Sequence, residues 1–129
     1  MNEDFVTYEL AVKLKERGFN CMYPIAMYNE RGVFHELYTS VGNMQYYDYD
    51  DFDERDTIAP TISQVLKWLR EEQGYNVNMR IYSPDGWYWT IQDRDGNYCC
   101  SHLTLSDDLF ETYEQAALAG ISYVLDNLI

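Results

Sequence analysis

Positive charge is scarce in this chain. Nine Lys and Arg residues stand against 22 Asp and Glu residues, which gives a net charge of −13 at pH 7. A field of that sign repels nucleic acid and anionic lipid, and it keeps a protein in solution. We therefore expect no direct contact with nucleic acid and no binding to a membrane.

Long apolar runs and cysteines are also few. The sequence has no run of about 18 apolar residues and no apolar segment near its start that is typical of a signal peptide. Two of the three cysteines, Cys99 and Cys100, are adjacent. Their side chains would point to opposite faces of a strand, which disfavours a framework of structural disulfides. The expected location is the reducing cytoplasm.

Familiar catalytic and metal-binding motifs are missing as well. The sequence contains no G-x-S-x-G, H-E-x-x-H, phosphate-binding loop or dinucleotide fingerprint. Cys100 and His102 can share a strand face, but no C-x-x-C or H-x-x-x-H pair accompanies them, and buried thiols are the simpler interpretation. We predict no catalytic residue, no cofactor and no metal site, and an enzyme is disfavoured.

The apolar residues that are present suffice for one packed domain. With 129 residues, 47% of them hydrophobic, the chain can bury a sizeable core. We predict a single α+β domain over residues 1–129, with three helices and about five to six antiparallel strands in the order α-β-β-(β)-α-β-β-β-α. The similar segments LKERGFN and LREEQGYN favour a weak internal αββ repeat, or equally two independent helix stops.

The best-specified stretch is a helix followed by a hairpin. Apolar residues recur with helical spacing at Ile62, Val65, Leu66 and Leu69. Gly74 is the expected stop, so the helix should span 62–73 and cover a sheet. Apolar residues then alternate on both sides of the turn at 83–86, which predicts two antiparallel strands.

Two further helices are predicted from their capping residues. Thr7 is the expected N-cap of the first helix and Gly18 its stop. Thr112 and Gln115 form a Thr-x-x-Gln capping box at the start of the last helix. Between the first two helices we expect strands at about 21–28, 33–39 and 44–49, and after the hairpin a strand at about 97–102.

An acidic run follows the third of these strands. Six carboxylates lie within nine residues: Asp48, Asp50, Asp51, Asp53, Glu54 and Asp56. Counted from Asp48, a calcium loop would need a ligand where Phe52 stands and a glycine where Asp53 stands, so an EF-hand is excluded. We interpret residues 46–57 as an acidic connector, or alternatively as part of an acidic surface, and a looser cation site in this run is left open.

Aromatic residues crowd the predicted hairpin. Tyr82, Trp87, Tyr88 and Trp89 form the candidate interaction surface. Only one face of the hairpin can belong to the core, so either the two tryptophans or the two tyrosines are left for contact with a partner.

Three segments carry a resemblance: residues 10–19 (LAVKLKERGF), 59–71 (APTISQVLKWLRE) and 111–116 (ETYEQA). In these segments the chain resembles small uncharacterised proteins from prophage and mobile-element neighbourhoods of gut Bacteroidetes. The resemblance implies a bacterial or phage cytoplasmic context, no known activity and no residue roles.

The favoured function is a non-enzymatic protein-interaction module whose partner is another protein or a second copy of the chain. One alternative is an acidic nucleic-acid mimic that inhibits a DNA-binding enzyme. Another is a small enzyme with an aromatic-lined cleft near Trp87, Trp89 and His102. A small-molecule ligand is left open by the sequence.

Overall fold

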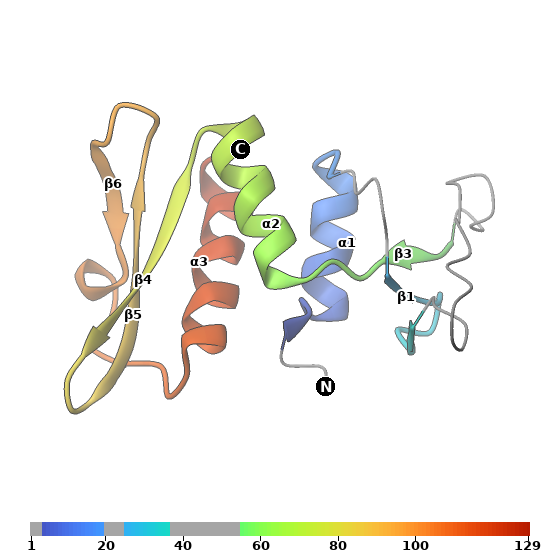
Figure 1. Ribbon diagram of the computed structural model, residues 1–129, viewed down its shortest axis with the longest axis horizontal. Helices are drawn as coiled ribbons and strands as arrows, with labels where there is room; N and C mark the ends of the chain where they lie inside the picture. The colour runs from blue at the N-terminus through green and yellow to red at the C-terminus, as the bar shows by residue number, and fades with distance from the viewer. Residues whose placement is uncertain (1–3, 20–24, 37–54) are drawn as a thin grey trace, which may run out of the picture. The chain divides into compact units, whose positions relative to one another are not determined.

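The computed structural model describes residues 4–19, 25–36 and 55–129. The chain forms two compact units, a first unit of residues 4–61 and a second unit of residues 62–129. The described residues contain three α-helices and two three-stranded antiparallel sheets, which confirms the predicted α+β class (Figure 1). The single domain over 1–129 stays a prediction.

Helix α1 of the first unit spans Tyr8–Glu16. Thr7 caps its start, because the Thr7 hydroxyl accepts a hydrogen bond from the Leu10 amide at 3.3 Å. The helix ends just before Gly18, which has φ of 81°. The predicted cap and the predicted stop are both confirmed.

The sheet of the first unit is built around a central strand. Its strands are β1 (Ala26–Tyr28), β2 (Phe34–Glu36) and β3 (Thr57–Ile58), in the order β2-β1-β3. β1 and β2 fall within two predicted strands. β3 begins in the segment predicted to be an acidic connector, and its two residues are too few to show strand alternation. The strand predicted at 44–49 lies outside the described residues.

Tyr28 of β1 is a buried aromatic residue. Its side chain is 8% exposed, and its hydroxyl donates to the Val6 carbonyl oxygen at 2.5 Å. Burial raises the pKa of Tyr28 above its ordinary value of 10.0. The neutral phenol therefore stabilises the fold below pH 10 or so, and that contribution is lost as the pH rises through the raised pKa.

Tyr28→Phe is expected to lower the free energy of unfolding by about 1–3 kcal/mol near neutral pH, because the Val6 carbonyl loses its donor. Tyr8, whose ring lies 5.5 Å from that of Tyr28, provides the control Tyr8→Phe, with an expected change below about 0.5 kcal/mol. Urea unfolding at about pH 8 and about pH 11 measures the alkaline loss. The parent protein should lose more stability than Tyr28→Phe, and equal losses would contradict this account.

Helix α2 (Ile62–Trp68) opens the second unit and continues into a π-helical turn, η3 (Leu69–Gln73). Gly74 follows in the left-handed conformation, with φ of 80°, and the Tyr75 amide donates to the Leu69 carbonyl at 2.9 Å. The predicted bounds and stop are confirmed. The wider last turn was not predicted.

The sheet of the second unit contains the predicted hairpin and one more strand. Its strands are β4 (Asn76–Tyr82), β5 (Gly86–Gln92) and β6 (Tyr98–Ser101), in the order β4-β5-β6. The chain reverses after Tyr82 as predicted, and the Asp85 amide donates to the Tyr82 carbonyl at 2.8 Å. A short 3-10 helix, η4 (His102–Thr104), follows β6.

Helix α3 (Tyr113–Asn127) covers this sheet. The Thr112 hydroxyl accepts from the Gln115 amide at 3.1 Å, and the Gln115 side chain accepts from the Glu111 amide at 3.0 Å, which is the predicted box extended by one residue.

One prediction was wrong, namely which helix packs directly on the sheet. We expected the helix at 62–73 to lie on the sheet, but α3 lies between the sheet and α2 (Figure 1). The reason is the breadth of the apolar surface of α3. Its small residues Ala116, Ala117 and Gly120 are buried, so other elements can approach the helix closely.

Candidate functional site

The second sheet has one covered face and one open face. Val77, Trp89 and Ile91 belong to the covered face and are at most 7% exposed. Strand alternation places another nine residues on the outer face: Asn76, Asn78, Arg80, Tyr82, Tyr88, Thr90, Gln92, Tyr98 and Ser101. Both α2 and α3 lie on the opposite side of the sheet (Figure 1).

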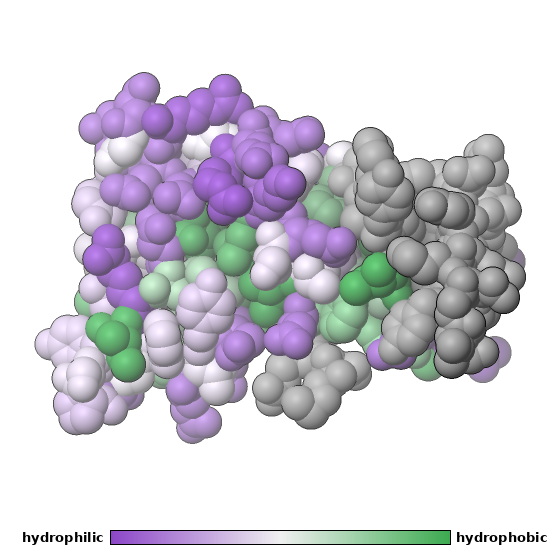
Figure 2. Space-filling model, in the orientation of Figure 1, coloured by the Kyte–Doolittle hydropathy of each residue, from purple (hydrophilic) through white to green (hydrophobic). Residues whose placement is uncertain are grey.

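None of these nine outer-face residues is acidic, although the chain as a whole has 22 acidic residues. The nine include one arginine and three tyrosines. Figure 2 shows strongly hydrophilic side chains at the end of this unit that holds the β5–β6 turn, and side chains of intermediate hydropathy beside a hydrophobic group near the β4–β5 turn. The outer face is therefore polar and aromatic rather than acidic.

The four aromatic residues of the candidate interaction surface divide between the two faces. Trp89 is 3% exposed and its ring lies 5.1 Å from that of Tyr123. Trp87 is half-buried on the same face. Tyr82 is 53% exposed on the outer face, and its ring lies 6.4 Å from that of Tyr88. The tryptophans thus belong to the core side, and only the tyrosines remain on the open surface.

Tyr98 is an outer-face residue that the sequence did not reveal. It is 62% exposed and pairs with Gln92 of β5. The register shifts at Cys99, so that Ser101 pairs with Thr90 instead of continuing a strict alternation from Tyr98. The bulge brings Tyr98 and Ser101 to the same face, which a period of two does not predict.

Arg80 and Tyr98 meet over Thr90. The Arg80 Nη2 donates to the Tyr98 hydroxyl at 3.4 Å. Because β4 and β6 are the edge strands, this hydrogen bond crosses β5. Arg80 pairs with Tyr88 and Tyr98 pairs with Gln92, and Thr90 is the outer-face residue of β5 between them. This crossing explains why Thr90 is only 5% exposed on an open face.

A depression of about 510 Å³ lies on the outer face. Eight residues line it: Arg80, Tyr88, Thr90, Tyr98, Cys99, Cys100, Ser101 and Thr104. The Thr90 hydroxyl is buried there and has no hydrogen-bond partner among the residues that the structure describes. A buried unsatisfied polar group costs about 1–3 kcal/mol, so the arrangement favours a ligand that bonds to Thr90.

The Nδ1 atom of His102 is also buried without a hydrogen-bond partner within the described part of the chain. The imidazole ring lies 5.8 Å from the ring of Trp89 and 4.8 Å from that of Phe110. Neither Trp87, Trp89 nor His102 lines the depression on the outer face. The depression on the outer face is therefore not the aromatic cleft that the sequence analysis placed near Trp87, Trp89 and His102.

Cys99 is the exposed cysteine of the depression. Partial desolvation raises the pKa of the Cys99 thiol, and the charges of Asp93 and Cys100 raise it further. A raised pKa leaves little thiolate at neutral pH, which disfavours a nucleophile here. Within residues 4–19, 25–36 and 55–129, no three His, Cys, Asp or Glu side chains gather as a metal site.

The acidic run is described only at its end. Asp48, Asp50, Asp51, Asp53 and Glu54 lie outside the described residues. Asp56 is half-buried, and its backbone carbonyl accepts a hydrogen bond from the Lys15 ammonium group at 3.0 Å.

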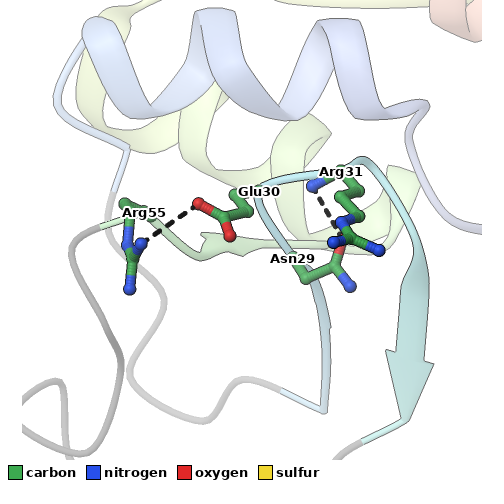
Figure 3. Close-up of polar contacts among 4 residues, drawn as sticks. All are labelled: Asn29, Glu30, Arg31 and Arg55. Atoms are coloured by element: carbon green, nitrogen blue, oxygen red, sulfur yellow. Dashed lines mark hydrogen bonds and ion pairs between the residues drawn. The ribbon is translucent and has the colours of Figure 1, made fainter.

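A second depression, of about 280 Å³, lies in the first unit beside Asp56. Arg55 pairs with Glu30 at 3.3 Å, and the Arg31 amide donates to the Asn29 side chain at 2.9 Å (Figure 3). The side chains of Arg55 and Glu30 are 65% and 54% exposed, so the pair contributes little stability. Arg55 is therefore already paired, whereas the hydrogen bond of Arg31 is made by its backbone amide and not by its guanidinium.

The chain matches no protein-family model, no curated protein and no solved structure. Among the helices of the described residues, none combines the length and apolar character that crossing a membrane requires.

Proposed function

We propose that the protein is a non-enzymatic interaction module that binds a protein partner through the outer face of the β4-β5-β6 sheet. The observation that carries the proposal is the composition of this face, which has no carboxylate, one arginine and three tyrosines in a chain of net charge −13. Protein interfaces are depleted in most charged residues at their centre and enriched in Tyr and Arg.

The tyrosines supply the contact area. Tyr82 and Tyr98 are 53% and 62% exposed, and the half-buried Tyr88 is also on this face. A tyrosine can bury about 150–250 Å². Even if each is buried only in part, three tyrosines contribute a large share of the roughly 800 Å² that each partner buries in a standard interface.

Neither alternative function gains a specific observation from the described residues. The nucleic-acid mimic depends on the acidic run, which lies mostly outside them. The enzyme requires titratable groups that converge in an aromatic cleft, whereas His102 is enclosed by the rings of Trp89 and Phe110.

Site-specific photo-crosslinking tests the proposal. Benzoylphenylalanine replaces Tyr82 or Tyr98 on the outer face, and it replaces the exposed Asn127 of α3 as the control. In host lysate, positions 82 and 98 should crosslink to the same polypeptide, and position 127 should not. Crosslinking that is equal at all three positions, or absent at 82 and 98, would contradict the proposal.

A further inference from the structure

We infer that the depression on the outer face binds a carboxylate side chain, of Asp or Glu, from an extended segment of the protein partner. The inference rests on the proposed function and specifies the chemical group that the surface recognises. Arg80 supplies charge-assisted hydrogen bonds, and Thr90 supplies a hydroxyl donor.

Arg80 has no counter-ion among the described residues of this acidic chain. Acidic residues outnumber basic ones 22 to 9, yet Arg80 forms no ion pair within the part of the chain that the structure describes. Its hydrogen bond to the neutral Tyr98 phenol is 3.4 Å long, against an optimum of about 2.9 Å. A carboxylate can accept two parallel hydrogen bonds from a guanidinium, so it displaces the phenol.

Thr90 lies beneath the hydrogen bond between Arg80 and Tyr98, which the carboxylate would replace. Its hydroxyl is buried and lacks a partner, and it lines the same depression as Arg80. Arg80 pairs with Tyr88, and Thr90 is two residues further along β5 on the same face, so Arg80 and Thr90 are diagonal neighbours across β4 and β5. Diagonal neighbours are about 7–8 Å apart, which a long arginine side chain spans. One carboxylate can therefore accept from both residues.

The lining of the depression favours a carboxylate that is part of a protein. Arg80 is the only charged residue of the lining, and the charge of Asp93 reaches the depression only from outside that lining, at Cys99. The depression is open on a sheet face, where a free small acid would keep most of its surface in water. An extended segment also contacts Tyr82, Tyr88 and Tyr98, and it can continue past the depression, which favours a side chain over a chain end.

Binding of defined peptides tests this inference. The probe is an N-acetylated, C-amidated pentapeptide, Gly-Ser-Glu-Ser-Gly, and the comparison peptides carry Gln in place of Glu, with either an amidated or a free C-terminus. Titration of the nitrogen-15-labelled full chain follows the Arg80 Nε–Hε and Thr90 amide signals. The Glu peptide should shift both signals, and the amidated Gln peptide should shift neither.

Two substitutions distinguish specific recognition of the carboxylate by Arg80 from non-specific attraction by any arginine. Arg80→Gln should weaken binding of the Glu peptide by about tenfold or more, because a charge-assisted bond is lost. Arg94→Gln, at an exposed arginine of the β5–β6 turn, is the matched control and should leave the affinity unchanged. Equal binding of the amidated Glu and Gln peptides, or unchanged affinity in Arg80→Gln, overturns the inference.

Thr90→Val keeps the shape of the side chain and removes its hydroxyl. It should weaken binding of the Glu peptide by about two- to tenfold, while the melting temperature stays the same or rises, because an unsatisfied buried group is removed. A lower melting temperature with unchanged affinity would assign Thr90 a structural role and overturn its part in binding.

Tighter binding of the free-C-terminus peptide than of the Glu peptide would overturn the choice of a side chain over a chain end. If positions 82 and 98 crosslink to a partner while the Glu peptide fails to bind, the carboxylate inference fails and the proposed function stands.

Discussion

Trp89→Ala is expected to lower the free energy of unfolding by about 3–5 kcal/mol in urea denaturation. Trp89 is 3% exposed, stacks on His102 at 5.8 Å and packs on Tyr123 at 5.1 Å. Removal of the indole leaves a cavity between the sheet and α3 that these neighbours fill only partly. Since whole domains are stable by about 5–15 kcal/mol, this loss brings the second unit close to unfolding.

Tyr82→Ala is the matched control, because Tyr82 is an aromatic residue of the same hairpin that is 53% exposed on the other face. Its expected cost is below about 1 kcal/mol. Similar losses for the two variants would show that the hairpin does not separate a buried tryptophan face from an open tyrosine face.

Gly120→Val is expected to cost about 3 kcal/mol, which is at the upper end for overpacking of a core. A Cβ atom at this position would lie 2.7 Å from Val77 Cγ1 and 3.2 Å from two atoms of Trp89. Gly120→Ala should cost about 1–2 kcal/mol, even though alanine improves helix propensity by about 1 kcal/mol. Thermal and urea unfolding measure both variants.

The control for Gly120 is Asn127→Gln, which adds one methylene group at an exposed position of the same helix. Its expected change is within about 0.5 kcal/mol. If Gly120→Ala stabilises the protein as a propensity scale alone predicts, then α3 does not approach the sheet as closely as the fold requires.

The helices could be predicted from sequence because their signals are local. Thr7 and Thr112 bond to amides three residues ahead, and Gly74 takes a positive φ. Each signal acts within one turn of its own helix. A glycine inside a helix also favours a close approach to the backbone, and at Gly120 the side chains of Val77 and Trp89 make this approach.

The packing of these helices could not be predicted, because it depends on contacts between distant segments. The apolar stripe of α2 fits a helix that covers a sheet, but it fits equally a helix that packs on α3. The suggested αββ repeat meets a similar limit. Among the described residues, the central strand of the first sheet is β1, the first strand after α1. The central strand of the second sheet is β5, the second strand after α2.

The candidate site was predicted only in part. Strand alternation predicted that Arg80 and Tyr82 lie on the other face of their strand from Val77. It left open which face of the hairpin is exposed. Tyr98 was missed because a bulge sets its register with β5. The Thr90 hydroxyl is buried because side chains from three strands meet around it, and no local pattern in the sequence predicts such a meeting.

Hydroxyl-radical footprinting with mass-spectrometric readout tests most directly whether the tyrosine face is the open one. Tyr82 and Tyr98 are expected to oxidise rapidly, and Trp89, whose side chain is 3% exposed, at least about tenfold more slowly. Oxidation of Trp89 at the rate of Tyr98, or protection of both tyrosines in the isolated protein, would contradict the assignment of the tyrosine face as the open one.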